Sequence, residues 1–389
     1  MSNFIFPLYF DYSATTPLEP RILEKILPYF YCKFGNPSSR NHIFGWQAEY
    51  IIENSRIKIS NFLNCDSREI IFTSGATESN NIAIKGLTFF YKNKFSKILS
   101  LNIEHKSIIN SFNYLLNYGY NVIYLNVKFN GLLDLNLLNL FSKNTLLLSV
   151  MYVNNEIGVI QNINYLSLFC KKNKIIFHID AVQSLGKINI NLNLINIDIL
   201  SISCHKIYGP KGIGALYIRR KSNLYFIPLF HGGGQEKKIR SGTLSTSLII
   251  GMCEIFSNLF KEMYFDNLKI RNYKNIFLIE LLKIDSIYIN GDIKYRIPHN
   301  LNISFNFIEG ESLIISLKNI ALSTGSACAS NSLEPSYVIK NLNKSYNIIH
   351  SSLRFTFGRF NILSDFYYLL KLLFINIINL RKLSPLYVL

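Results

Sequence analysis

Short apolar runs that end in polar residues recur along the first half of the chain. Runs of four or five mostly apolar positions without helical spacing predict buried strands, because a parallel sheet is covered on both faces. Such runs occupy residues 69–73, 97–101, 146–150, 175–179, 199–202 and 214–218. Strands with polar residues at their carboxyl ends favour an open α/β fold, in which ligands bind at that edge of the sheet.

Helical spacing appears between and after these strands. Apolar residues recur every three or four positions over residues 45–63 and 269–282, which predicts two helices. Beyond about residue 262 the pattern changes, and strands and a helix are expected at 287–289, 302–305 and 313–318. We therefore expect a large domain over residues 16–262 and a small α/β domain formed by residues 1–15 and 263–389.

Two of the predicted strands end in the residue types that pyridoxal 5'-phosphate requires. The run at 175–179 leads into Asp180, and the run at 199–202 leads to Lys206. In enzymes that use this cofactor, a carboxylate pairs with the protonated pyridine nitrogen and a lysine forms the Schiff base. The separation of 26 residues leaves room for one crossover back to the same sheet edge. A lone strand-end lysine more often reaches water, so the prediction depends on the pair.

A candidate phosphate site lies at residues 74–81, SGATESNN. This segment follows a predicted strand and begins a helix, so backbone N–H groups and the helix dipole converge there. Thr77 adds a hydroxyl. Such a junction is weak evidence alone, but together with Asp180 and Lys206 it predicts a phosphate cradle.

The formal net charge of +17 at first suggests a nucleic acid or an anionic membrane as partner. The lysines are scattered among Asn, Ile, Tyr and Phe, and short clusters such as Arg219-Arg220-Lys221 are typical of a solvated face. The C-terminal apolar run is interrupted by Lys371 and by asparagines. We therefore expect neither direct nucleic-acid binding nor a membrane location.

The six cysteines are widely spaced, with no two closer than 33 residues: Cys32, Cys65, Cys170, Cys204, Cys253 and Cys328. This spacing excludes a CxxC zinc or redox pair. Without a signal peptide, unclustered cysteines predict a protein of the reducing cytoplasm. The segment around Cys328, STGSACASN, is rich in small residues and predicts a loop, although most cysteines in such loops are inert.

The motifs HIDAVQS at residues 178–184 and SISCHKIYGPKGIGALY at residues 201–217 resemble the cysteine desulfurases of the IscS/NifS class, with the housekeeping IscS type nearest. The resemblance runs from about residue 8 to residue 386 and includes DYSATTP, GATESN, EHK, RSGT and GSAC in order. It implies fold type I of the pyridoxal-phosphate transferases, which is aspartate-aminotransferase-like. This fold has a mostly parallel seven-stranded sheet and a smaller C-terminal α/β domain.

The resemblance also implies the roles of individual residues. Lys206 and His105 would move protons, and the Cys328 thiolate, in a loop at residues 323–335, would take sulfur from L-cysteine to leave alanine and a persulfide. The implied cofactor contacts are Ala76, Thr77, Asn155, Asp180, Gln183, Ser203, His205, Lys206 and Thr243. Thr243 would come from the neighbouring subunit of a homodimer with shared active sites. The implied substrate contacts are Asn36, Asn155 and Arg354, since a guanidinium fork fits a carboxylate.

The family also implies sulfur acceptors. An IscU-like iron–sulfur scaffold protein and tRNA-thiolation proteins would receive the sulfur, and Cys328 would transiently ligate a 2Fe–2S cluster shared with the scaffold. Two features depart from the family pattern. Cys204 stands where glycine is usual, either as a tolerated small residue, which we favour, or as a change to the phosphate pocket. The sequence also stops at SPLYVL, where close relatives continue with a polar tail that docks the scaffold.

Two other function classes would share part of this pattern. A transaminase or lyase of the same fold would keep Asp180 and Lys206 but has no use for Cys328. A degenerate protein that only binds a scaffold would be expected to lose catalytic groups, and none is missing from the motifs. The desulfurase prediction accounts for every motif quoted above.

Overall fold

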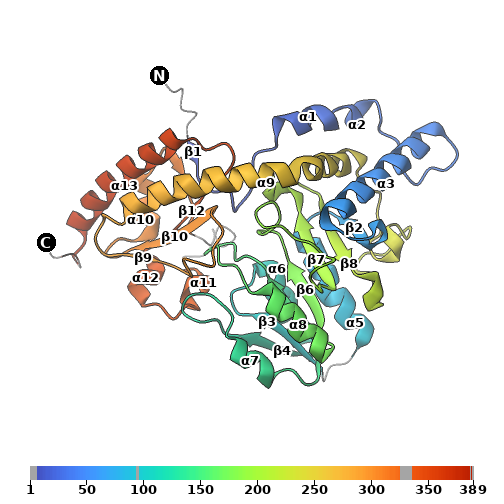
Figure 1. Cartoon of the computed structure of the whole chain (residues 1–389), viewed down its shortest axis with the longest axis horizontal. Helices are drawn as coiled ribbons and strands as arrows, with labels where there is room; N and C mark the ends of the chain where they lie inside the picture. Colours follow the sequence, from blue (N-terminus) through green and yellow to red (C-terminus); the bar gives the residue numbers. More distant parts are fainter. Residues whose placement is uncertain (1–6, 93–95, 325–334, 386, 388–389) are drawn as a thin grey trace.

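The computed structural model describes residues 7–92, 96–324, 335–385 and 387. Two α/β domains lie side by side and are joined by one long helix, as Figure 1 shows. The predicted cysteine loop at residues 323–335, with Cys328, lies largely outside the described residues.

The large domain is built on a seven-stranded sheet (Figure 1). From one edge to the other, its strands are β2 (Ile70–Thr73), β8 (Gly214–Ile218), β7 (Ile199–Ser203), β6 (Ile176–Asp180), β5 (Thr145–Met151), β3 (Lys97–Leu101) and β4 (Asn121–Leu125). Only β8 runs antiparallel to its neighbours. The mostly parallel fold is confirmed, and 214–218 is the return strand beside the lysine strand, as predicted. The edge strand β4 was not predicted.

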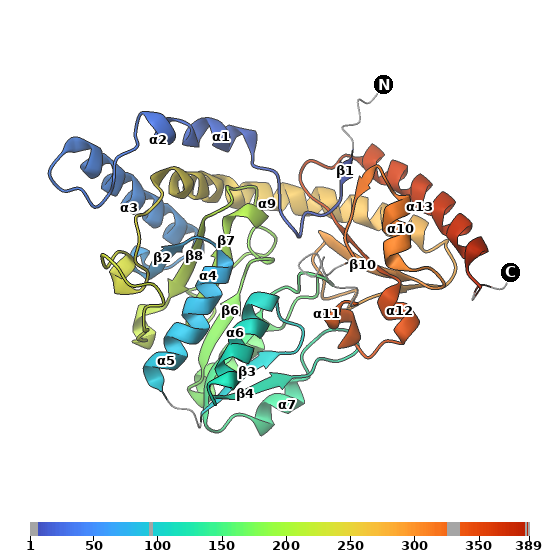
Figure 2. The ribbon, with the colours of Figure 1, turned by 180° about the vertical axis from the view of Figure 1, so that it is seen from behind.

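Both faces of this sheet are covered, because successive side chains of a strand point to opposite sides. In β2, Ile70 and Phe72 enter one core, and Ile71 enters the other. The helices α3 (Ile43–Leu63) and α8 (Ile163–Asn173) cover the first face (Figure 1). The second face is covered by α4 (Ala76–Asn81), the π-helical turn Ile82–Gly86, α5 (Leu87–Tyr91) and α6 (Lys106–Asn117), as Figure 2 shows from behind.

The small domain has a three-stranded antiparallel sheet of β9 (Ile287–Ile289), β10 (Asn300–Phe305) and β12 (Ser352–Thr356). The N-terminal strand β1 (Leu8–Tyr9) joins this domain by pairing with β11 (Ile320–Ala321). The core beneath the sheet is apolar and rich in phenylalanine. Helices α10 (Gly310–Ser316) and α13 (Leu363–Leu383) pack on it.

The helix α9 (Thr246–Leu281) runs through both domains (Figure 1). Ile255 and Leu259 lie in the core of the large domain, whereas Ile270 and Phe277 lie in that of the small domain. At 36 residues it is about 54 Å long. The predicted helix at 269–282 is its second half, and the boundary at residue 262, which falls within α9, stays a prediction.

The remaining helices are short. They are α1 (Pro20–Ile26), α2 (Pro28–Tyr31), α7 (Leu135–Leu140), α11 (Tyr337–Lys340) and α12 (Tyr346–His350). Within the described residues, α13 alone is long and apolar enough to cross a membrane by length and composition. Its buried residues, such as Phe366 and Leu373, lie in the core of the small domain.

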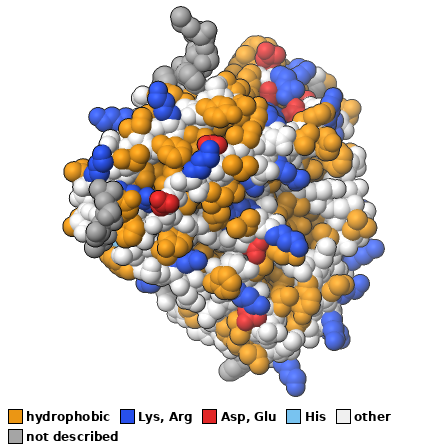
Figure 3. Space-filling view, turned by 60° about the vertical axis from the view of Figure 1, so that its left-hand side comes forward, with side chains coloured by type: hydrophobic (Ala, Val, Ile, Leu, Met, Phe, Trp, Pro, Cys, Tyr) orange, Lys and Arg blue, Asp and Glu red, His pale blue; other side chains and the backbone are white. Residues whose placement is uncertain are grey.

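Basic side chains do not form a continuous patch on the face shown in Figure 3, where most lie singly among apolar and uncharged groups. The cluster at residues 219–221 is partly internal. The Arg219 guanidinium donates to the backbone carbonyls of Ile197, Leu192 and Ile195 at 2.7–2.9 Å. Arg220 pairs with Asp66 at 3.2 Å. Arg219 therefore serves the fold, whereas Arg220 and Lys221 are exposed.

Candidate active site

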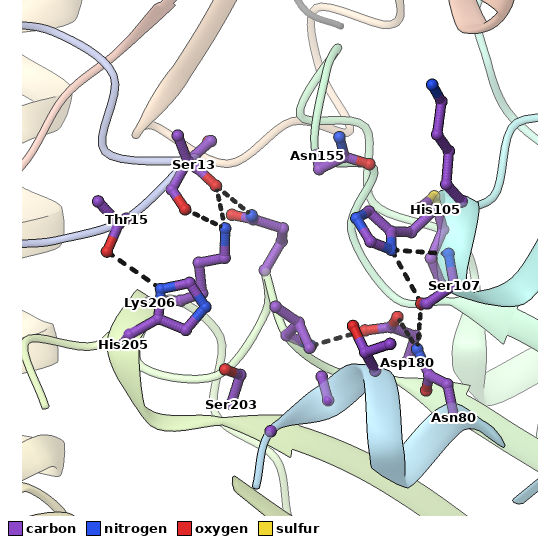
Figure 4. Close-up of a pocket in the computed structure, with 18 of the residues that line it drawn as sticks. Ser13, Thr15, Asn80, His105, Ser107, Asn155, Asp180, Ser203, His205 and Lys206 are labelled. Atoms are coloured by element: carbon purple, nitrogen blue, oxygen red, sulfur yellow. Dashed lines mark hydrogen bonds between the residues drawn. The ribbon is translucent and has the colours of Figure 1, made fainter. Parts of the chain in front are cut away.

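The carboxyl ends of β5, β6 and β7 open into a cavity of about 640 Å³. This size is typical of a small-molecule site. Ten of the predicted residues line it: Ala76, Thr77, His105, Asn155, Asp180, Gln183, Ser203, His205, Lys206 and Arg354. Figure 4 labels His105, Asn155, Asp180, Ser203, His205 and Lys206 among them. Segments from both domains therefore meet at the edge of the sheet where the sequence pattern predicts a ligand site.

Lys206 lies in a single 3₁₀ turn, Cys204–Lys206, directly after β7. Its Nζ donates to the backbone carbonyls of Ser13 and Ala14 at 2.6 and 2.5 Å (Figure 4). The neighbouring His205 lies with Nδ1 3.0 Å from the Thr15 hydroxyl. The N-terminal DYSATTP segment therefore holds the lysine turn in place at the cavity wall.

Asp180 is the last residue of β6 and is only 6% exposed. Its Oδ1 accepts a hydrogen bond from the Val182 N–H, and its Oδ2 accepts one from the Asn80 amide at 2.9 Å. Among the described residues, no lysine or arginine forms an ion pair with it. A buried carboxylate with only neutral partners needs a cation, which fits the pyridinium nitrogen of pyridoxal phosphate.

The start of α4 fits the phosphate of the same cofactor. No side chain caps this helix terminus, and Gly75 precedes it with a φ of 155°, which favours glycine. A Cβ built on Gly75 would meet nothing within 4 Å, so the cavity side of this turn is open. A Cβ on Gly214 would come within 2.7 Å of the Gly75 Cα, so the close approach of β8 also requires glycine. Ser203 and His205 line the same cavity.

His105 forms the N-cap of α6. Its Nδ1 accepts a hydrogen bond from the Ser107 N–H at 3.1 Å and lies 2.8 Å from the Ser107 hydroxyl (Figure 4). Burial is the main cause that lowers the pKa of His105 below its usual value. The lowered pKa favours the neutral imidazole at pH 7.

Arg354 and Asn155 bring the two domains together at the cavity. Arg354 lies in β12 with only 2% of its side chain exposed, and its Nη2 pairs with Asp11 at 2.7 Å. Its Nη1 donates to the backbone carbonyl of Asn155 at 3.1 Å. The Asn155 Oδ1 is buried and has no hydrogen-bond partner among the described residues, which leaves a polar group for a ligand.

Two predicted residues do not line the cavity within one chain. Asn36 is exposed, and its Oδ1 accepts a hydrogen bond from the Ser38 N–H, as in an ordinary Asn-Pro turn. Thr243 is exposed on the loop that follows the glycine-rich segment. Their predicted roles therefore require a second chain. Cys328 lies outside the described residues, so its role stays a prediction.

Sequence reasoning missed Asn80 and Ser107, which line the cavity and contact Asp180 and His105. A weak signal was present, because Asn80 is the last residue of the predicted GATESN motif and Ser107 directly follows EHK. Asp11, which pairs with Arg354, was quoted only as part of DYSATTP.

Cys204 lies in the large core, fully buried and away from the cavity lining. A Cβ on Gly209 would come within 2.0 Å of its Sγ, so the thiol packs against that glycine. Burial raises the pKa of the Cys204 thiol far above its usual value. This cysteine is therefore a small apolar core residue. Within the described residues, no group of three or more His, Cys, Asp or Glu could hold a metal ion.

Comparisons with known proteins agree with this geometry. Residues 8–369 match the family model described as aminotransferase class-V. Cysteine desulfurase IscS of Methylobacillus flagellatus is 49% identical over 383 residues, which cover 98% of this chain and 95% of the relative. A solved NifS-like protein has a TM-score of 0.87 at 32% identity, covering 94% of this chain and 98% of that one. A structure described as SspA in complex with cysteine has a TM-score of 0.81 at 34% identity, covering 91% and 100%.

A mostly parallel sheet with a strand-end lysine and a buried aspartate at one cavity defines the pyridoxal-phosphate transferases of fold type I. The chain belongs to the class-V aminotransferase family of these enzymes and, within it, to the cysteine desulfurases of the IscS type. The predicted fold class, cofactor and family are thereby confirmed.

Proposed function

We propose that this chain removes sulfur from L-cysteine with pyridoxal 5'-phosphate, giving L-alanine and a persulfide on Cys328. The observation that carries the proposal is the joint placement of Lys206, Asp180 and Arg354 on one cavity. Asp180 would pair with the pyridinium nitrogen, and the start of α4 with Thr77 would hold the phosphate. When bound, the cofactor supplies an electron sink for the substrate carbons.

Each of the protein residues would have a separate role in the reaction. The Arg354 guanidinium, oriented by Asp11, would bind the substrate α-carboxylate, with the Asn155 amide beside it. Lys206 Nζ would accept the α-proton. The Cys328 Sγ thiolate would attack the substrate sulfur, so that an S–S bond forms and the C–S bond breaks. The electron pair of that bond stays with the carbon, which takes up a proton to become the alanine methyl group.

A homodimer with shared sites accounts for Asn36 and Thr243, which lie outside the cavity of their own chain. Exposed large apolar side chains gather on the same N-terminal segment as Asn36, namely Phe30, Tyr31, Phe34, Phe44 and Trp46. Patches of this kind mark protein interfaces. We propose that a second copy covers them and that Thr243 completes the phosphate site of that copy.

The expected acceptors are an IscU-like iron–sulfur scaffold protein and tRNA-thiolation proteins in the cytoplasm. A 2Fe–2S cluster bound through Cys328 would be cargo shared with the scaffold. We propose the domain boundaries 15/16 and 262/263 as part of the same function. Leu8 and Phe10 lie in the core of the small domain, whereas Tyr12 lies in that of the large domain.

The test is a product analysis of the purified holoenzyme given L-cysteine and a reductant. Alanine and sulfide in equal amounts are expected. A keto acid would instead indicate a transaminase or lyase, and no product would indicate a binding protein. Lys206→Ala is the matched control, because it should give neither alanine nor sulfide.

A further inference from the structure

A continuous chain of hydrogen bonds connects Asp180 to His105 at the base of the cavity (Figure 4). The Asn80 Nδ2 lies 2.9 Å from the Asp180 Oδ2 and 2.9 Å from the Ser107 Oγ. The Ser107 Oγ in turn lies 2.8 Å from the His105 Nδ1. Asn80 comes from α4 and Ser107 from α6, so the chain depends on how these helices pack against β6.

The chemistry of these groups fixes the direction of every bond in the chain. The Asn80 amide nitrogen must face Asp180, because its oxygen would be repelled by the carboxylate. Asn80 Nδ2 has two hydrogens, and both are used, one on Asp180 and one on Ser107. The Ser107 oxygen therefore accepts from Asn80, and its own hydrogen is directed at His105.

The same reasoning assigns the tautomer of His105. The Ser107 backbone N–H also points at the His105 Nδ1, at 3.1 Å. Two donors converge on Nδ1, so this nitrogen must offer its lone pair, and the ring proton of the neutral imidazole lies on Nε2. The charged groups that act on the ring are Asp180, Lys206 and Lys106. In Figure 4 the other ring nitrogen of His105 points to the open side of the cavity.

We propose that Ser107 and Asn80 are positioning residues that fix His105 as the tautomer with its proton on Nε2. The resting enzyme then presents an N–H donor, not a lone pair, from His105 to the cavity. This inference rests on the proposed function, and it divides the proton chemistry between two residues. Lys206 accepts the α-proton, and His105 donates a hydrogen bond or a proton to the ligand.

The test is ¹⁵N NMR of the holoenzyme with ring-labelled histidine, in which His105 is assigned from the spectrum of His105→Gln. The wild type should show a protonated Nε2 and an unprotonated Nδ1. Ser107→Ala removes one donor to the neutral ring, so the pKa of His105 should rise by about half to one unit. Ser107→Thr keeps the hydroxyl and should restore the wild-type titration.

The matched control is Ser111→Ala on the same helix, whose hydroxyl bonds the Ser107 carbonyl and Asn81 rather than His105. Its His105 titration should equal that of the wild type. A wild-type ring protonated on Nδ1, or a Ser107→Ala titration identical to that of the wild type, would overturn the inference. Neither reading depends on turnover, so a failure to form alanine would reject the proposed function and leave the tautomer result intact.

Discussion

Glu236 forms a buried ion pair that holds the loop leading to Thr243. The Arg56 guanidinium donates to both carboxylate oxygens, at 2.7 and 3.0 Å, and the Phe72 N–H donates to Oε2 at 2.6 Å. The two side chains are only 8% and 2% exposed. Glu236 and the two lysines that follow it have left-handed φ values of 44°, 57° and 64°, each of which costs about 1–2 kcal/mol. The buried bonds of Glu236 offset this strain.

Glu236→Gln should destabilise the protein by about 3 kcal/mol. An amide has one acceptor oxygen for the three N–H donors that converge on the carboxylate, so one donor is left unpaired and Arg56 loses its buried counter-charge. Removing one partner of a buried pair costs about 3–5 kcal/mol. We expect a loss of stability at the lower end of this range, because Glu53, which is 55% exposed, still pairs with Arg56 at 3.1 Å.

The measurement is urea unfolding of the holoenzyme at fixed protein concentration. Asp66→Asn is the control, because its pairs with Arg68 and Arg220 are exposed to solvent, so its effect should be much smaller than that of Glu236→Gln. The double variant Arg56→Met, Glu236→Leu removes both charges of the buried pair. It should therefore lower the free energy of unfolding by less than Glu236→Gln alone. A loss below about 1 kcal/mol for Glu236→Gln would refute the reasoning that this pair anchors the loop.

Four further changes test the site and the core. Lys206→Ala should lose the visible absorption band of bound cofactor with an unchanged circular dichroism spectrum, and a wild-type band would contradict its role. Cys328→Ser should bind cofactor and L-cysteine but release no sulfide with a reductant present; near-normal sulfide would move the acceptor to another thiol. Cys204→Gly should keep full activity and lose about 1 kcal/mol of stability, whereas weaker cofactor binding would place Cys204 at the pocket. Burial lowers the pKa of His178 to about 3, so stability should fall as pH drops from about 6.5 towards 3 by about 1.4 kcal/mol per unit; His178→Gln should flatten this slope in acid unfolding.

Site residues that lie at the ends of strands were predictable from the sequence. Asp180 and Lys206 come at the ends of mostly apolar runs, so their place at the sheet edge follows from the rule for ligand sites in open α/β sheets. The edge strand β4 was not predicted, although residues 122–125 form a run of four apolar residues like those that predicted the other strands. The first half of α9 escaped because exposed Phe260, Tyr264 and Phe265 blur its helical period.

Contacts that depend on packing were not predictable. Lys206 is held by the carbonyls of Ser13 and Ala14, and a backbone carbonyl has no residue-type signal. The bond between Asn80 and Ser107 joins residues 27 apart, and it forms only because α4 and α6 lie side by side. The positions of Asn36 and Thr243 relative to a cavity depend on a second chain, which one sequence pattern cannot place.

The shared helix α9 determines where this polypeptide can be divided. A break at residue 262 would leave Ile255 and Leu259 on one fragment and Ile270 and Phe277 on the other, each on a shortened helix. Each fragment would then lose part of the cover of its own core and expose apolar surface to water. Halves produced separately should aggregate, and useful split points should lie outside residues 246–281. The two domains are therefore one unit for any experiment that cuts, permutes or fuses the chain.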